Sequence, residues 1–163
     1  MTTPFLRAGD TLSGYSGTAF ATIDGQNVEM FFVKNLRATA KKNKADIKTL
    51  GNRNTQKKAT GWEGTGTMTI YYVTSRFREM MQKYIQTGVD TYFDITVANE
   101  DPASAIGKQV VSLIGVNLDE IVMAALDVES DALDEEVPFT FHNVLITDKF
   151  TDPIPANPRR NDS

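Results

Sequence analysis

Alternating apolar and polar residues predict that this chain is built mainly from β-strands. Residues 16–23 alternate with a period near two, and the Asp24-Gly25 pair then predicts a tight turn into a second strand, residues 28–33. Further strands are predicted at residues 91–98, 108–117, 121–129 and 137–146. Together with the hairpin described next, the count reaches roughly seven or eight strands, which favours an antiparallel β-sandwich or barrel.

The longest predicted element is an extended β-hairpin. Its approach strand covers residues 33–50, its polar tip residues 51–61 and its return strand residues 62–73. Threonine and tyrosine alternate with other residues along the return strand, which is typical of a half-buried sheet. A hairpin of this length cannot be buried in its own small domain. Since exposed strand edges template association, we expect it to meet another molecule.

One amphipathic helix is predicted at about residues 75–87. Thr74 or Ser75 is expected to cap its start, and Gly88 to end it in the left-handed conformation. Large apolar side chains recur at intervals of three and four residues: Phe77, Met80, Met81, Tyr84 and Ile85. Because these positions form a single stripe, the helix is expected to flank the sheet and cover one of its faces.

The ends of the chain differ from its centre. Residues 1–12 are expected to form an N-terminal arm, residues 13–150 one β domain, and residues 151–163, with three prolines, a C-terminal tail. The first residues lack the charged and apolar regions of a secretion signal, and no apolar run is long enough for a membrane-spanning helix. The expected location is therefore the cytoplasm, with no membrane insertion by this chain.

Charge is distributed in two separate blocks. The 163 residues carry a net charge of −4, yet nine of the 17 Lys and Arg residues fall in the hairpin: Lys34, Arg37, Lys41, Lys42, Lys44, Lys48, Arg53, Lys57 and Lys58. No Lys or Arg occurs between Lys108 and Lys149, an interval that contains Asp119, Glu120, Asp127, Glu129, Asp131, Asp134, Glu135, Glu136 and Asp148. Such blocks are either solvated faces or partner surfaces.

The sequence contains no motif that indicates catalysis. There is no cysteine, and the single histidine, His142, lies in a predicted strand without a serine or cysteine motif beside it. The glycine-rich residues 61–66 lack the spacing of a phosphate-binding loop and open a strand rather than a helix. We therefore expect no enzyme, no catalytic residues and no cofactor.

A calcium loop is also unexpected, although Asp127, Glu129 and Asp131 occupy its first, third and fifth places. The sixth place is Ala132, where the sharp turn needs glycine, and the twelfth is Pro138, where a carboxylate is needed. No metal site is expected.

Nucleic-acid binding is the alternative function that the sequence leaves open. The cations of residues 34–58 could follow a phosphate backbone. Against this stand the pI near 5.0 and the lack of an aromatic residue between Leu36 and Gly61, which leaves no platform for base stacking.

Self-assembly is the hypothesis that uses both charge blocks. Copies that pair their strand edges can close into a ring, and contacts between unlike faces then propagate as a filament. The predicted interface joins a basic set, Lys41, Lys42, Lys44, Lys48, Arg53, Lys57 and Lys58, to an acidic set, Asp127, Glu129, Asp131, Asp134, Glu135 and Glu136. Each exposed pair contributes only about 0–1 kcal/mol, so the contact depends on repetition.

Several short motifs carry a family resemblance. They are Lys42-Asn43-Lys44, Gly64-Thr65-Gly66-Thr67, Val73-Thr74-Ser75, Leu126-Asp127-Val128 and Glu135-Glu136-Val137-Pro138-Phe139-Thr140-Phe141. In this order, over residues 13–146, the chain resembles the tail tube proteins of PBSX-like prophages and related contractile tails. The resemblance implies a β-sandwich with a flanking helix, assembled as hexameric rings that stack into a hollow tube, with four strands of each subunit lining the lumen.

The resemblance also implies partners and a location. These are copies of the same chain, a surrounding sheath, a tape measure protein and a baseplate, with DNA only in transit if the particle is a true phage. Assembly in the bacterial cytoplasm would be followed by residence in a phage tail or a bacteriocin-like particle. Residues 41–60 are then expected to form the loop that contacts other subunits.

Overall fold

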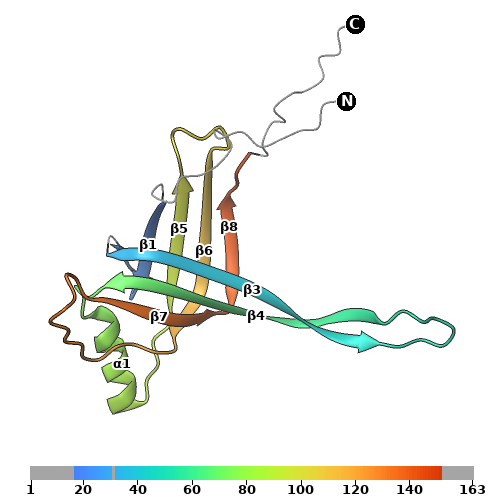
Figure 1. The fold of residues 1–163 in the computed structure, drawn as a ribbon, viewed down its shortest axis with the longest axis horizontal. Coiled ribbons are helices and arrows are strands. Elements are labelled where there is room, and N and C mark those ends of the chain that lie inside the picture. Colours follow the sequence, from blue (N-terminus) through green and yellow to red (C-terminus); the bar gives the residue numbers. More distant parts are fainter. Residues whose placement is uncertain (1–16, 31, 152–163) are drawn as a thin grey trace, which may run out of the picture. The chain divides into compact units, whose positions relative to one another are not determined.

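The computed structural model describes residues 17–30 and 32–151 (Figure 1). Its elements are β1 (Gly17–Ile23), β2 (Gln26–Glu29), β3 (Val33–Ile47), β4 (Gln56–Tyr71), α1 (Arg76–Thr87), β5 (Phe93–Glu100), β6 (Lys108–Leu118), β7 (Asp134–Phe141) and β8 (Asn143–Asp148). The predicted class is confirmed: within the described residues the fold is mainly β, with one helix and a long antiparallel hairpin. The predicted N-terminal arm and nearly all of the predicted C-terminal tail lie outside the described residues.

The chain divides into two compact units. The first contains the described parts of residues 1–31, 95–112 and 144–163, and the second contains residues 32–94 and 113–143. Strands β5 and β6 contribute residues to both units. The expectation that residues 13–150 act as one domain stays a prediction.

In the first unit, β1 and β2 form a hairpin. Residues Phe20 and Glu29 are paired across it, and the turn residues Asp24 and Gly25 have φ values of 52° and 78°. Two consecutive positive φ values suit the type I′ turn that the Asp-Gly pair predicts. Strand β1 pairs with β5, β5 with β6 and β6 with β8. Ala21 and Ile95 are among the buried residues.

In the second unit, the strands follow the order β6-β7-β4-β3. Cross-strand partners lie on the same side of a sheet, so Leu36, Met68 and Val137 share its core face. Met68, Val137, Phe139 and Ile70 are fully buried there. The strands therefore alternate between a packed face and an open face, as the sequence pattern predicts.

Helix α1 packs on the second unit through Phe77. The Phe77 ring centroid lies 6.2 Å from that of Phe32 and 5.9 Å from that of Phe93, and Phe77 is 2% exposed. The helix ends as predicted, because Gly88 has φ 72° and its N–H donates to the carbonyl of Tyr84. At the start, Ser75 occupies the N-cap position without a side-chain cap bond.

The apolar stripe of α1 is covered over only part of its length. Phe77 is buried, whereas Tyr84 is 49% exposed and Ile85 is 66% exposed. The sequence predicted a helix that flanks the sheet and covers one of its faces. The helix continues past the sheet that Phe77 contacts, so its C-terminal half presents apolar side chains to the outside.

Two strand predictions near the C-terminus are wrong. Residues 121–129 form no strand; Ile121 is buried, but Leu126 and Val128 are each 93% exposed because this segment has no sheet partner. Residues 137–146 form two strands rather than one, with the break at His142. The break has a topological cause: β7 pairs with β4, while β8 pairs with β6.

The hairpin boundaries also differ from the prediction. Strand β4 begins at Gln56, six residues earlier than the predicted start of the return strand, so the tip is shorter and covers residues 48–55. Polar residues extend the ladder, with Lys58 opposite Ala45 and Lys57 opposite Asp46. Backbone hydrogen bonds, rather than apolar side chains, define these strand ends. The predicted strand 28–33 is likewise divided, since β2 ends at Glu29.

Candidate subunit interface

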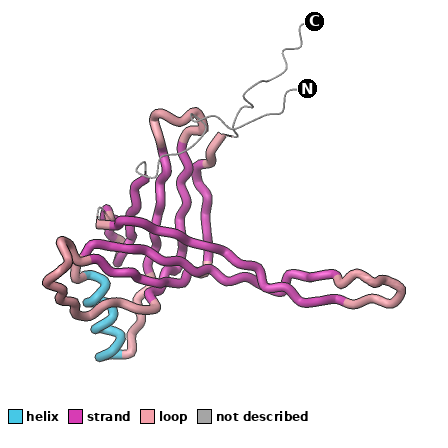
Figure 2. Tube along the Cα trace, viewed as in Figure 1, coloured by secondary structure: helices cyan, strands magenta, loops and turns pink. Residues whose placement is uncertain are grey.

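The β3–β4 hairpin projects beyond its own sheet (Figure 2). Strand β7 pairs with β4 only over Gly64–Tyr71, so the eight β4 residues from Gln56 to Glu63 have β3 as their one neighbouring strand among the described residues. At about 3.3 Å per residue, this part of the ladder extends about 26 Å past β7. We call residues 41–63 the projecting arm; apart from the half-buried Asn43 its side chains are exposed.

A β-bulge interrupts the projecting arm. Asn43 pairs with Gly61 and Lys44 with Ala59, which leaves Thr60 as the extra residue. The hydroxyl of Thr60 donates to the carbonyl of Asn43 at 3.1 Å. Bulges increase the local twist of a strand pair, and the two strands of the arm wind around each other in Figure 1.

The tip of the projecting arm contains a four-residue turn, Thr49–Asn52, with a leucine at its second position. The N–H of Asn52 donates to the carbonyl of Thr49 at 3.5 Å, and Gly51 has φ 80°. Glycine is favoured here because the third position of a type II turn needs positive φ. Leu50, the second residue of the turn, is fully exposed.

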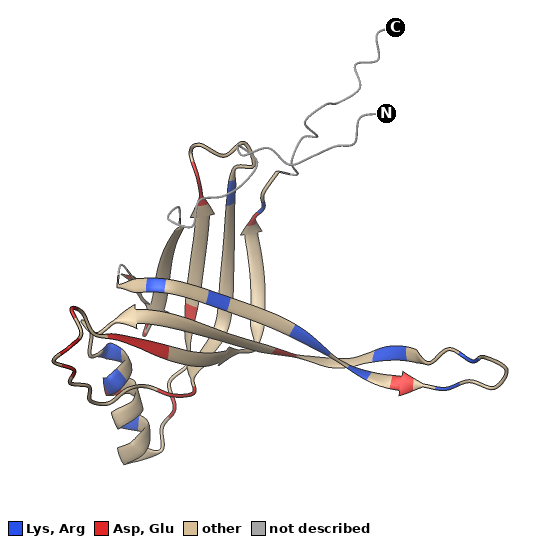
Figure 3. Ribbon diagram, viewed as in Figure 1, with Lys and Arg blue, Asp and Glu red and all other residues tan. Residues whose placement is uncertain are grey.

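All seven cations of the predicted basic set lie on the projecting arm or its tip, and all are exposed (Figure 3). The set is Lys41, Lys42, Lys44, Lys48, Arg53, Lys57 and Lys58. Lys57 makes an ion pair across the arm, with its Nζ 3.6 Å from Asp46 Oδ1. The structure thus brings the basic set together on one element.

The predicted acidic set is divided between a loop and a strand. We call residues 119–133 the acidic loop; it carries Asp127, Glu129 and Asp131, all exposed. Asp134 and Glu136 lie on β7 and are also exposed. Asp134 pairs within the subunit, because its Oδ2 lies 3.3 Å from Nζ of Lys34. The acidic loop and the arm lie at opposite ends of the second unit in Figure 3.

Glu135 is placed differently from the rest of the acidic set. Its side chain is 1% exposed, and its Oε1 lies 3.0 Å from Nη1 of Arg78 on α1. Arg78 also donates to the carbonyls of Thr74 and Val122, and its guanidinium lies 4.0 Å from the centroid of the Tyr72 ring. In the subunit, Glu135 therefore joins β7 to α1 instead of facing outward as the sequence predicted.

The open face of the second unit is rich in threonine. Cross-strand rows on this face are Asn35–Thr69–Glu136, Arg37–Thr67–Pro138 and Thr39–Thr65–Thr140.

On the opposite, packed face, two glycines of β4 lie under aromatic rings. A Cβ on Gly64 would lie 2.6 Å from Cε2 of Phe141. Gly66 lies under Phe139 in the same way. Glycine at these two positions lets the rings touch the backbone of β4.

A groove lies between the middle of α1 and the end of β6. We call it the α1 groove; its volume is about 300 Å³, and it is lined by Met80, Met81, Tyr84, Asp90, Thr91, Asn117, Leu118 and Asp119. Nδ2 of Asn117 donates to Oδ1 of Asp90 at 2.8 Å. Asp90 lies outside every motif of the sequence, and Asp119 stands out there only as a member of the acidic block. The feature of the sequence that could have indicated this groove is the apolar stripe of α1, because it is longer than the contact of Phe77 with its neighbours requires.

The single histidine, His142, lies at the surface of the second unit. It is exposed, its ring lies over Gly115, and Gly115 has φ 68°. The groove beside it contains one carboxylate, that of Glu63.

Within residues 17–30 and 32–151, no three His, Asp or Glu side chains are grouped so that they could hold a metal ion. No helix in that part of the chain has the length and apolar character needed to cross a membrane.

Sequence comparisons place the chain among phage proteins. A family profile described as phage tail tube protein matches residues 4–148. The phage-like element PBSX protein XkdM of Bacillus subtilis (strain 168) is 42% identical over 147 residues, which cover 90% of this chain and 97% of that protein. The uncharacterized protein YqbM of the same strain is 44% identical over 138 residues, which cover 85% and 91%.

Solved structures of contractile particles share the fold. A chain in the tube-terminating cap of the anti-feeding prophage has a TM-score of 0.64 at 12% identity, over 87% of this chain and 94% of that chain. A chain in the extended sheath–tube complex of the PVC extracellular contractile injection system has a TM-score of 0.63 at 11% identity, over 83% and 90%. From the profile match and the Bacillus relatives, the chain belongs to the phage tail tube protein family.

Proposed function

We propose that this protein is a structural subunit that assembles into hexameric rings, and that the rings stack into the hollow inner tube of a contractile tail or tail-like particle. The observation that carries the proposal is the projecting arm, which extends about 26 Å beyond the sheet that supports it. A solitary subunit gains nothing from such an arm and exposes its strand edges, whereas a neighbouring copy can cover both. Membership of the tail tube family supports the same conclusion.

The ring would close through the outer edge of β3. This strand has 15 residues and one hydrogen-bonded neighbour among the described strands, β4. Pairing its outer edge with a strand of the next subunit would extend the sheet β6-β7-β4-β3 around the ring. Each subunit would then contribute these four strands to an inner barrel.

The lumen would be lined by the threonine-rich open face. Thr65, Thr67 and Thr69 of β4 present small neutral hydroxyl side chains there, and the charged residues Arg37 and Glu136 have opposite signs. Phosphate binding needs a surplus of cations, so a lining of this kind lets DNA pass without holding it. The tube would act as a mechanical conduit for DNA or for penetration of an envelope, without catalytic turnover.

Ring stacking would bring the basic arm to the acidic loop of the next ring. The arm carries its seven cations at one end of the second unit, and Asp127, Glu129 and Asp131 lie at the other end (Figure 3). Each exposed ion pair contributes about 0–1 kcal/mol, but the contact repeats at every subunit of a ring. Further partners under this proposal are a sheath outside the tube, a tape measure protein and a baseplate, with assembly in the bacterial cytoplasm.

Electron microscopy of the purified protein tests the proposal. Negative-stain images at high protein concentration should show hollow tubes, or hexameric rings that stack as the concentration rises. A matched variant, in which residues 43–61 are replaced by an Asn-Gly turn, keeps the part of β4 that pairs with β7 and should form no tubes. A monodisperse monomer at high concentration, or normal tubes from the shortened variant, would overturn the proposal.

A further inference from the structure

We infer that the α1 groove is the receptor for the hairpin tip of a subunit in the adjacent ring, with Leu50 as the apolar anchor. This inference rests on the proposed stacking of rings and adds the two surfaces that meet. It assigns an interface role to Asp90 and Asp119, and to the exposed half of the α1 stripe.

The tip presents an apolar apex between cations. Leu50 is fully exposed at the second position of the Thr49–Asn52 turn, with Lys48 on one side and Arg53 on the other. A single exposed leucine is common on protein surfaces. This one lies at the end of a segment that extends about 26 Å beyond the sheet, so it has no route back to the core of its own unit.

The α1 groove has the complementary composition. Met80, Met81, Tyr84 and Leu118 provide an apolar lining, and Asp90 and Asp119 provide carboxylates. The hydrogen bond from Asn117 holds one oxygen of Asp90 at the groove. A volume of about 300 Å³ suits one or two inserted side chains and is at the small end for a metabolite site. Methionine side chains adapt readily to an inserted apolar group.

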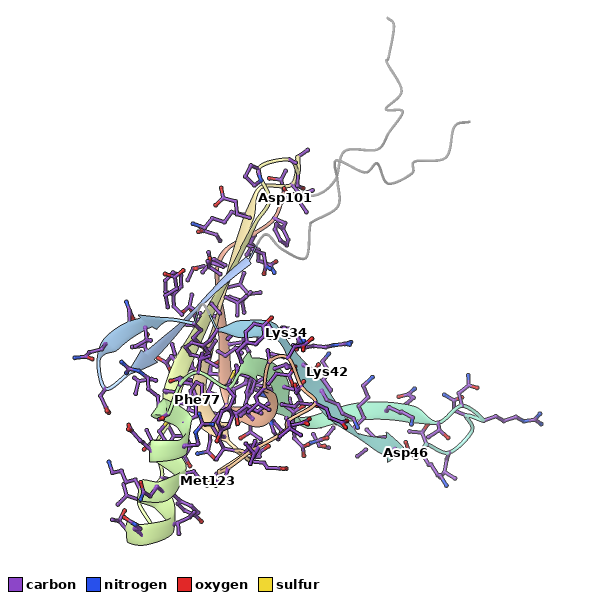
Figure 4. The ribbon with its side chains drawn as sticks, turned by 60° about the vertical axis from the view of Figure 1, so that its left-hand side comes forward. Lys34, Lys42, Asp46, Phe77, Asp101 and Met123 are labelled. Atoms are coloured by element: carbon purple, nitrogen blue, oxygen red, sulfur yellow. The ribbon has the colours of Figure 1, made fainter. Side chains whose placement is uncertain are left out.

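The occupant is a second copy because of where the two surfaces lie. In Figure 1, α1 and the hairpin tip are at opposite ends of the second unit, and the turned view of Figure 4 shows the same separation between Phe77 on α1 and Asp46 on the arm. A tip cannot reach the groove of its own subunit across that distance. A contact between unlike ends is heterologous, and such contacts propagate from subunit to subunit along an axis.

The α1 groove and the acidic loop can contact the same projecting arm. Strand β6 ends at Leu118 and the acidic loop begins at Asp119, so the groove, which both residues line, adjoins the acidic loop. An arm whose apex fills the groove therefore passes close to the loop. The apolar anchor would provide the affinity and the surrounding charges the orientation, as at other interfaces where one buried side chain dominates.

Cysteine cross-linking tests this assignment directly, because the chain has no cysteine of its own. The double variant Leu50→Cys with Met81→Cys should form a disulfide-linked ladder of multimers when assembled tubes are oxidised. The matched control pairs Leu50→Cys with Lys83→Cys, an exposed position on the same helix that does not line the groove. Its cross-linking should be about tenfold lower.

A second experiment changes Leu50 alone and measures the protein concentration needed for tube assembly. Leu50→Ser should raise the concentration needed for tube assembly about tenfold, while Leu50→Met, which keeps an apolar side chain, should leave it nearly unchanged. Tubes that form without a ladder above the Lys83→Cys control would overturn the groove assignment and leave the proposed function intact. A ladder through Phe5→Cys in place of Leu50→Cys would also overturn it, since another segment would then fill the groove. Failure of the unmodified chain to assemble at all would overturn both.

Discussion

The guanidinium of Arg78 lies 3.0 Å from the carboxylate of Glu135, and the two side chains are only 13% and 1% exposed. Oε1 of Glu135 accepts from Arg78, while Oε2 is buried and has no partner among the described residues. The pair joins α1 to β7, next to the carbonyl of Val122 at the start of the acidic loop. A buried charge of this kind depends on its single partner.

Removal of Arg78 should therefore destabilise the subunit strongly. Arg78→Met leaves Glu135 charged and buried, and we expect the free energy of unfolding to fall by about 3–5 kcal/mol. Urea unfolding of the non-assembling variant with the shortened hairpin would measure this, because assembly itself raises apparent stability.

The matched control is Lys34→Met, which removes the pair between Lys34 and Asp134. Both of those side chains are about half exposed, so the loss should stay within about 1 kcal/mol. Equal losses for the two variants would contradict the view that burial makes the Arg78 pair critical.

Gly66→Ala should destabilise the packed face of β4. Its new Cβ would lie 2.8 Å from the carbonyl oxygen of Arg37 and closer still to the ring of Phe139, so strand or ring must shift. Overpacking of this kind costs about 1–3 kcal/mol. Gly61→Ala in the same strand is the control, because no atom lies within 4 Å of its added Cβ. Urea unfolding curves that coincide for the two variants would be inconsistent with the packing described.

Charge reversal on the projecting arm should weaken ring stacking. The double variant Lys57→Glu with Lys58→Glu puts two acids where the proposal needs cations, so tube length in electron micrographs should fall sharply. Stacking of the unmodified protein should also weaken between about 0.05 and 0.5 M salt, because salt screens exposed charges.

The double variant Lys108→Glu with Lys149→Glu controls for net charge, since both lysines are exposed and lie outside the arm. It should leave tube length nearly unchanged. An equal effect of the two charge changes would argue for general repulsion instead of a specific contact.

If the open face lines the lumen, a cysteine at the position of Thr67 should react with small reagents and be protected from large ones. Thr67 is exposed on the open face of the subunit, and its neighbour across the ladder is Arg37. In assembled tubes, a Thr67→Cys thiol should react with a small maleimide but resist one that carries a large polyethylene glycol chain. In the shortened, non-assembling background the same thiol should react with both reagents. Reaction with the large reagent in intact tubes would place this face on the outside.

Much of the fold could be predicted from residues that are close together in the chain. The Asp24-Gly25 turn, the end of α1 at Gly88 and the existence of the long basic hairpin all follow from local backbone preferences and from period-two alternation. The exposed position of all seven arm cations was predictable for the same reason, since a strand pair without a covering layer has no interior.

Only the tertiary structure decided which of these surfaces are covered. Glu135 and Glu136 are adjacent in the sequence and alike in chemistry, yet one is buried on Arg78 and the other is exposed on the open face. Similarly, Phe77 and Ile85 belong to one apolar stripe, but the sheet reaches only the first. Periodicity reports which side of an element a residue lies on. What lies against that side depends on contacts between residues far apart in the chain, such as those that Arg78 makes with Val122 and Glu135.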